Sequence, residues 1–82
     1  MSDACKLFNA FYKGRNNFMT PTVISIKTVG HYAVELSSGI GMNGKIYGVT
    51  VLDFLTKDTT GLSQLFHSEG EAKEYITSLE EL

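Results

Sequence analysis

Residues 45–55 read KIYGVTVLDFL, the longest run of strand-favouring residues in the chain, and this run decides the fold class. Successive side chains of a strand point to opposite faces of its sheet, so Tyr47, Val49 and Val51 share one face. The opposite face carries Ile46, Thr50, Leu52 and Phe54. Because both faces are mostly apolar, we predict that this run is a central strand with cover on either side.

Three further segments have strand patterns. Residues 21–29, PTVISIKTV, are rich in β-branched residues and are bounded by Pro21 and Gly30. Residues 31–37, HYAVELS, alternate between two faces, and residues 62–67, LSQLFH, form a short fourth segment. The connections are too short for parallel crossovers. We therefore predict three or four antiparallel strands, and their order stays open.

The C-terminal residues predict an amphipathic helix from about Glu69 to Leu82. Apolar residues recur at helical spacing at Ala72, Tyr75, Ile76 and Leu79. Ser68 precedes Glu71 by three residues, which is the spacing of a capping box at a helix start. The chain is therefore expected to be one small α+β domain, residues 1–82, with this helix on one face of the sheet.

The N-terminal segment permits more than one interpretation. Four of its residues have helical spacing: Leu7, Phe8, Phe11 and Tyr12. This spacing favours a short helix over residues 3–13, although a strand or an extended arm stays open. One helix of about fourteen residues covers roughly half of one sheet face. The second face therefore needs either this segment or another subunit, and from this area argument we expect a homodimer.

The composition argues against several classes of protein. Cys5 is the only cysteine and His31 and His67 are the only histidines, so neither a disulfide nor the paired spacing of a metal site is present in the sequence. No apolar run reaches the length of a membrane span, and the first residues, MSDACKLFNAFYKG, do not resemble a secretory signal. We expect a cytoplasmic protein that uses no cofactor or metal and binds no membrane.

A glycine-rich motif, GIGMNG at residues 39–44, matches G-x-G-x-x-G and is followed by Lys45. Dinucleotide-binding folds place a helix after this motif, whereas a strand is predicted here. A hairpin turn in which Asn43 and Gly44 adopt positive φ is the favoured interpretation. An anion-holding loop with Lys45 as the counter-charge is the alternative.

A second candidate surface mixes cations and aromatic residues near the N-terminus, as proteins that bind single-stranded nucleic acid do. Its residues are Lys6, Phe8, Phe11, Tyr12, Lys13, Arg15 and Phe18. The net charge of −2 disfavours polyanionic partners, so these aromatic residues are more readily assigned to the core or to a subunit interface. The preferred function is a non-enzymatic accessory or protein-interaction module that self-associates, and nucleic-acid binding is the alternative.

Overall fold

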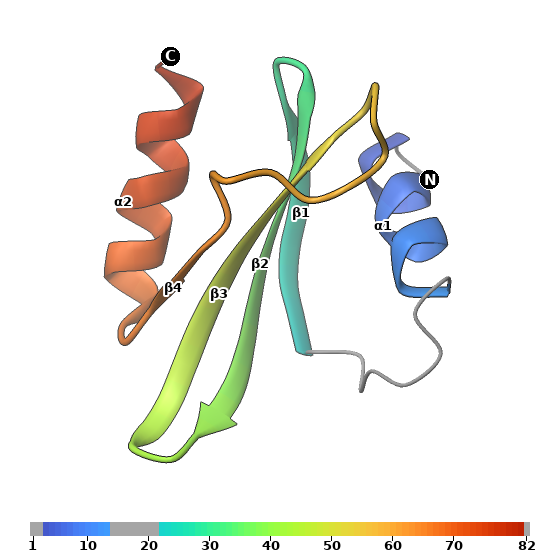
Figure 1. The fold of residues 1–82 in the computed structure, drawn as a ribbon. Coiled ribbons are helices and arrows are strands. Elements are labelled where there is room, and N and C mark those ends of the chain that lie inside the picture. The colour runs from blue at the N-terminus through green and yellow to red at the C-terminus, as the bar shows by residue number, and fades with distance from the viewer. Residues whose placement is uncertain (1–2, 14–21, 82) are drawn as a thin grey trace.

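The computed structural model describes residues 3–13 and 22–81, in which two helices lie on opposite faces of a four-stranded sheet (Figure 1). Helix α1 spans Asp3–Lys13 and helix α2 spans Glu69–Glu80. The strands are β1 (Thr22–Val29), β2 (Tyr32–Gly41), β3 (Gly44–Asp53) and β4 (Gln64–Phe66). The predicted α+β class, the antiparallel sheet, the C-terminal helix and the N-terminal helix are all confirmed.

The strands follow one another across the sheet in the order β1-β2-β3-β4, and all neighbours are antiparallel. The order that the sequence left open is thus a simple meander. Strand β3 lies between β2 and β4, so the prediction that residues 45–55 form a central strand is confirmed. At the turn between β1 and β2, Gly30 has a φ of 59°, a conformation that costs glycine little.

Helix α2 packs on one face of the sheet through the residues that its periodicity predicted. Its buried side chains are Ala72, Ile76 and Leu79. They contact a cluster of buried side chains on β2 and β3: Val34, Leu36, Val49 and Val51. The hydroxyl of Tyr75 donates a hydrogen bond of 2.5 Å to the carbonyl oxygen of Leu62, which ties the helix to the loop before β4.

Helix α1 covers part of the opposite face. Ala4, Leu7 and Phe8 are buried against Ala33 of β2 and Leu52 of β3. Of the two covers that the sequence allowed, the N-terminal segment therefore supplies this part within one chain. The homodimer expected from the area argument is no longer required at Ala33 and Leu52, because α1 already buries them.

The start of α2 yields a first prediction. Ser68 is the N-cap residue, and its Oγ accepts a hydrogen bond of 3.2 Å from the backbone N–H of Glu71. We expect Ser68→Ala to lower the free energy of unfolding by about 0.5–2 kcal/mol, because one N–H of the first turn loses its acceptor. Urea denaturation followed by circular dichroism measures this change. Ser68→Asp keeps an acceptor and should retain the stability; equal midpoints for Ser68→Ala and wild type would contradict the capping role.

Candidate functional site

The face of the sheet that α1 contacts is divided into a covered half and an open half. Cross-strand pairing of β2 with β3 places four rows on this face: Ala33–Leu52, Glu35–Thr50, Ser37–Gly48 and Gly39–Ile46. Helix α1 buries the first row and Glu35 of the second. We call the open half, made of Ser37, Gly39, Ile46, Gly48 and Leu65, the distal sheet face.

The distal sheet face is hollowed between aliphatic side chains. A hollow of about 250 Å³ is lined by Ser37, Ser38, Gly39, Ile40, Ile46, Gly48 and Leu65. A second hollow of about 300 Å³ adjoins it and shares Gly48 and Leu65. At Gly48, an added Cβ would lie 3.3 Å from the Oγ of Ser37 and 3.5 Å from Cδ2 of Leu65. The small residues thus form the floor of the hollow, and Leu65 and Ile46 stand beside it.

Large apolar side chains are exposed around the same region. Ile40 is 89% exposed and Leu65 is 74% exposed, and Met42 at the hairpin tip is fully exposed. Figure 1 shows the β2–β3 hairpin projecting beyond both helices, so neither helix covers this end of the sheet. Leu65 stands on the distal sheet face, whereas Ile40 follows Gly39 along β2 and belongs to the opposite face at the same end of the sheet. Exposed apolar side chains at an uncovered sheet end often mark a binding surface.

The glycine-rich segment forms this hairpin, as predicted. Gly39 and Gly41 belong to β2, and Gly41 pairs with Gly44 at the start of β3. The sequence predicted positive φ at both Asn43 and Gly44, and that detail is half wrong: Gly44 has a φ of 112°, whereas Asn43 keeps a negative φ. The turn itself consists of Met42 and Asn43, and Gly44 directly after it adopts the positive φ. Glycine accepts this conformation because it has no Cβ to clash with the backbone.

A buried carboxylate lies at the border between the two halves, and it was not among the residues predicted from the sequence. Glu35 on β2 has no exposed surface. The hydroxyl of Tyr12, near the C-terminal end of α1, donates a hydrogen bond to Oε1 of Glu35. Within the described parts of the chain, Oε2 has no hydrogen-bond partner. Burying an oxygen without a hydrogen-bond donor costs free energy, and the packing of α1 on the sheet must offset that cost.

Burial controls the protonation of this pair. Loss of solvation raises the pKa of Glu35, and the hydrogen bond from Tyr12 lowers it by less than burial raises it. The pKa of Tyr12 is raised as well, most strongly by burial and then by its hydrogen bond to Glu35 and the negative charge of Glu35. A hydrogen bond with Thr50 lowers this pKa by a smaller amount. Tyr12 therefore stays neutral and acts as a donor near neutral pH, and Glu35 keeps its proton to a higher pH than an exposed glutamate does.

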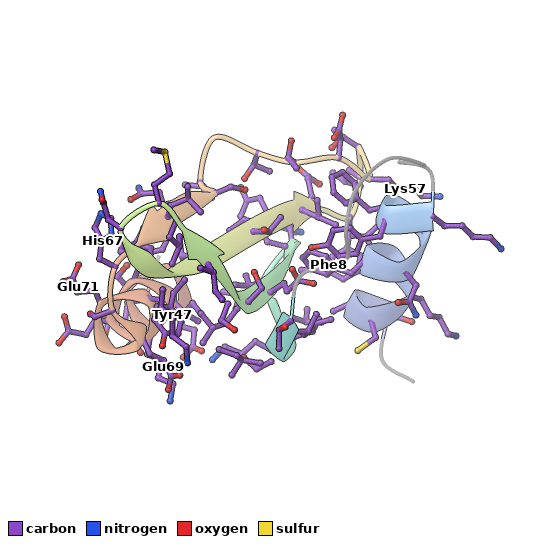
Figure 2. The ribbon with its side chains drawn as sticks, turned by 90° about the horizontal axis from the view of Figure 1, so that it is seen from below. Phe8, Tyr47, Lys57, His67, Glu69 and Glu71 are labelled. Atoms are coloured by element: carbon purple, nitrogen blue, oxygen red, sulfur yellow. The ribbon has the colours of Figure 1, made fainter. Side chains whose placement is uncertain are left out.

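The residues predicted to form an N-terminal contact surface do not share one face of α1. Phe8 is 1% exposed and lies in the core, and Figure 2 shows it on the sheet side of the helix. Phe11 and Tyr12 are half-buried and pack against each other edge to face, with ring centroids 5.6 Å apart. The two lysines at positions 6 and 13 are exposed, whereas Arg15 and Phe18 lie outside the described residues.

Other chemistry-bearing side chains stand apart from this region. His31 and His67 are exposed, and no three metal-ligating side chains gather anywhere in residues 3–13 and 22–81. Neither helix of the described chain has the length and apolar character needed to cross a membrane. Comparison with protein-family models, curated proteins and solved structures finds no match to this chain.

Proposed function

We propose that this domain is a non-enzymatic protein-interaction module that self-associates through its distal sheet face. The observation that supports the proposal is the open half of the sheet, where a hollow floored by small residues adjoins the exposed Leu65. We place its action in the cytoplasm, where the single cysteine, Cys5, stays reduced.

A second copy of the chain would suit this surface, because the surface carries both a hollow and side chains that stand beside it. A two-fold interface brings the same patch together from both subunits, so each patch must offer both a ridge and a hollow. Leu65 and Ile46 supply the ridge, and Gly48 and Gly39 supply the floor of the hollow. None of the residues that line the hollow is charged, which favours an apolar partner surface over a polyanion.

The size of the patch indicates a weak dimer. Three strands about 4.8 Å apart span about 14 Å, and five residues of a strand span about 17 Å. With the hairpin tip included, this area is smaller than the roughly 800 Å² per partner of a standard interface. We therefore expect self-association in the micromolar range, with monomers at low concentration.

Sedimentation analysis of charge variants tests the proposal. In Leu65→Glu a carboxylate enters the apolar patch, and the dimer should be lost because the carboxylate would be buried without a partner. Leu55→Glu is the matched control: Leu55 is 84% exposed and follows β3 at the end of the sheet opposite the hairpin, so its dimer should be unchanged. Protein concentrations from about 1 to about 500 µM cover the expected range.

Four outcomes are informative. Loss of the dimer in Leu65→Glu alone supports the distal sheet face as the interface. Equal loss in both variants would indicate a non-specific effect of charge, and a wild-type monomer throughout would overturn self-association. Retention of the wild type on single-stranded DNA that weakens steeply with salt would instead favour nucleic-acid binding by the exposed cations of α1, Lys6 and Lys13.

A further inference from the structure

Helix α1 is attached to the sheet in a way that differs from α2. It lies at the N-terminal end of the described chain, and its C-terminal turn places Tyr12 over a carboxylate that the helix itself helps to bury. Helix α2 buries apolar groups alone: Ala72, Ile76 and Leu79. The half-buried Tyr75 of α2 keeps a hydrogen bond to the carbonyl oxygen of Leu62. Among the described residues, the docking of α1 alone takes a carboxyl group out of water.

In the part of the chain that the structure describes, few groups that could balance a negative charge face Glu35. The hydroxyl of Tyr12 faces it from α1. Its cross-strand neighbours are Thr50 on β3 and Ile26 on β1. Tyr12 is the only titratable group among these three, and it is neutral when it donates. Among residues 3–13 and 22–81, no cation is placed against Glu35, so an ionised Glu35 under α1 is unfavourable there, whereas a protonated Glu35 buries no charge.

We propose that α1 is a proton-sensitive latch, docked over the sheet while Glu35 is protonated and released when Glu35 loses its proton. Tyr12 holds the closed state through its hydrogen bond to Oε1. In the open state the carboxylate is hydrated, and both oxygens then find donors in water.

Release of the latch would change the surface proposed above for self-association. The row Glu35–Thr50 lies next to the row Ser37–Gly48, so the covered half and the distal sheet face form one continuous surface. With α1 displaced, Ala33 and Leu52 join this surface. The ionised Glu35 would then lie within this surface, between the row of Ala33 and the row of Ser37. A carboxylate buried there without a partner opposes association, so we expect dimers to weaken as the pH rises. This consequence rests on the proposed function, whereas the release of α1 itself does not depend on it.

The direction of the pH dependence follows from the position of the carboxyl group. Once released, Glu35 titrates near its ordinary value of 4.5, whereas burial raises its pKa in the docked state. Docking is therefore fully favoured below about pH 4.5. The opening equilibrium then increases with pH, by at most about tenfold per pH unit, until the pH passes the docked pKa.

Amide hydrogen exchange of the full chain measures this opening. The peptide that contains residues 3–13 should lose protection relative to β2 and β3 as the pH rises from 4 to 8, after correction for the intrinsic exchange rate. The measurement uses the Leu65→Glu background at low micromolar concentration, so dimer formation does not contribute. Cys5 lies on α1 and is partly buried, so its rate of modification by a thiol reagent, compared between variants at one pH, gives a second readout.

Three variants are compared with this background. Glu35→Gln has no proton to lose, so the protection of α1 should no longer depend on pH. Glu74→Gln removes an exposed carboxylate on the outer side of α2 and should leave the pH dependence intact. Tyr12→Phe removes the donor that closes the latch, so α1 should exchange faster and Cys5 should react faster at low pH, where α1 of the background is docked.

The result that overturns the latch is distinct from the result that overturns the dimer. If Glu35→Gln keeps the pH dependence, or if α1 exchanges only together with the sheet at every pH, the latch is wrong. If α1 opens as expected but the wild type stays monomeric, the latch stands and the proposed self-association fails.

Discussion

Phe8→Ala is expected to lower the free energy of unfolding by about 3–5 kcal/mol, because it truncates a large aromatic side chain in the core. Phe8 is the largest of the fully buried side chains, at 1% exposure, and it fills the space between α1, Ala33 and Leu52. Truncation removes the contacts of the ring and leaves a cavity. The strands beneath it are hydrogen-bonded to their neighbours and cannot shift far enough to fill that cavity. Chemical denaturation followed by near- and far-ultraviolet circular dichroism measures the loss.

A matched variant on the same helix separates packing from helix propensity. Phe11→Ala removes an aromatic ring that is only half-buried, so its cost should be well below that of Phe8→Ala. If both substitutions cost the same, the helix itself and not the buried ring would be the source of the stability. A Phe8→Ala variant as stable as wild type would show that α1 does not pack on the sheet in solution.

Tyr12→Phe is expected to cost about 1–3 kcal/mol below about pH 4.5, where α1 is docked, because neither oxygen of the buried Glu35 then has a donor among the described residues. Glu35→Leu, in contrast, should be neutral or stabilising, since an apolar side chain of similar volume replaces a buried acid. In the Glu35→Leu background, Tyr12→Phe removes a hydroxyl that no longer has its acceptor. Its cost should then largely vanish, and a full cost in that background would contradict the coupling of the pair.

The pH dependence of stability gives the same pair a second test. The folded pKa of Glu35 is raised above its ordinary value of 4.5, so above pH 4.5 the unfolded chain binds fewer protons than the folded one. The contribution of Glu35 to stability is therefore complete below about pH 4.5 and is lost as the pH rises through the folded pKa. Glu35→Leu should lack this decline.

Much of the architecture could be predicted from local patterns. The alternation in residues 45–55, the helical spacing around Ile76 and the cap at Ser68 each reflect a rule that acts over a few residues, and the structure confirms all three elements. The strand order is a different matter. Antiparallel pairing followed from the short connections, but several orders of four short strands satisfy that condition equally.

The site was less predictable, because it depends on where α1 ends over the sheet. The alternation of residues 31–37 placed Glu35 on the same face as Ala33, yet a glutamate at such a position is usually in solvent. It is buried in this fold because the last turn of α1 brings Tyr12 above it. One signal was available: Glu35 is flanked by Val34 and Leu36 in a segment whose pattern predicts a strand, which makes it a candidate for burial.

The contacts of α1 also bear on how the chain folds during synthesis. Its buried face meets Leu52, which leaves the ribosome about forty-four residues after Phe8, or several seconds later at about 5–20 residues per second. Through that interval the aromatic side of the nascent helix has no partner in its own chain. Strands β1 to β3 pair with their immediate neighbours and can assemble as they emerge. Helix α1 is thus made before the strands on which it packs, and until β3 emerges its aromatic residues are exposed to any chaperone that binds the emerging chain.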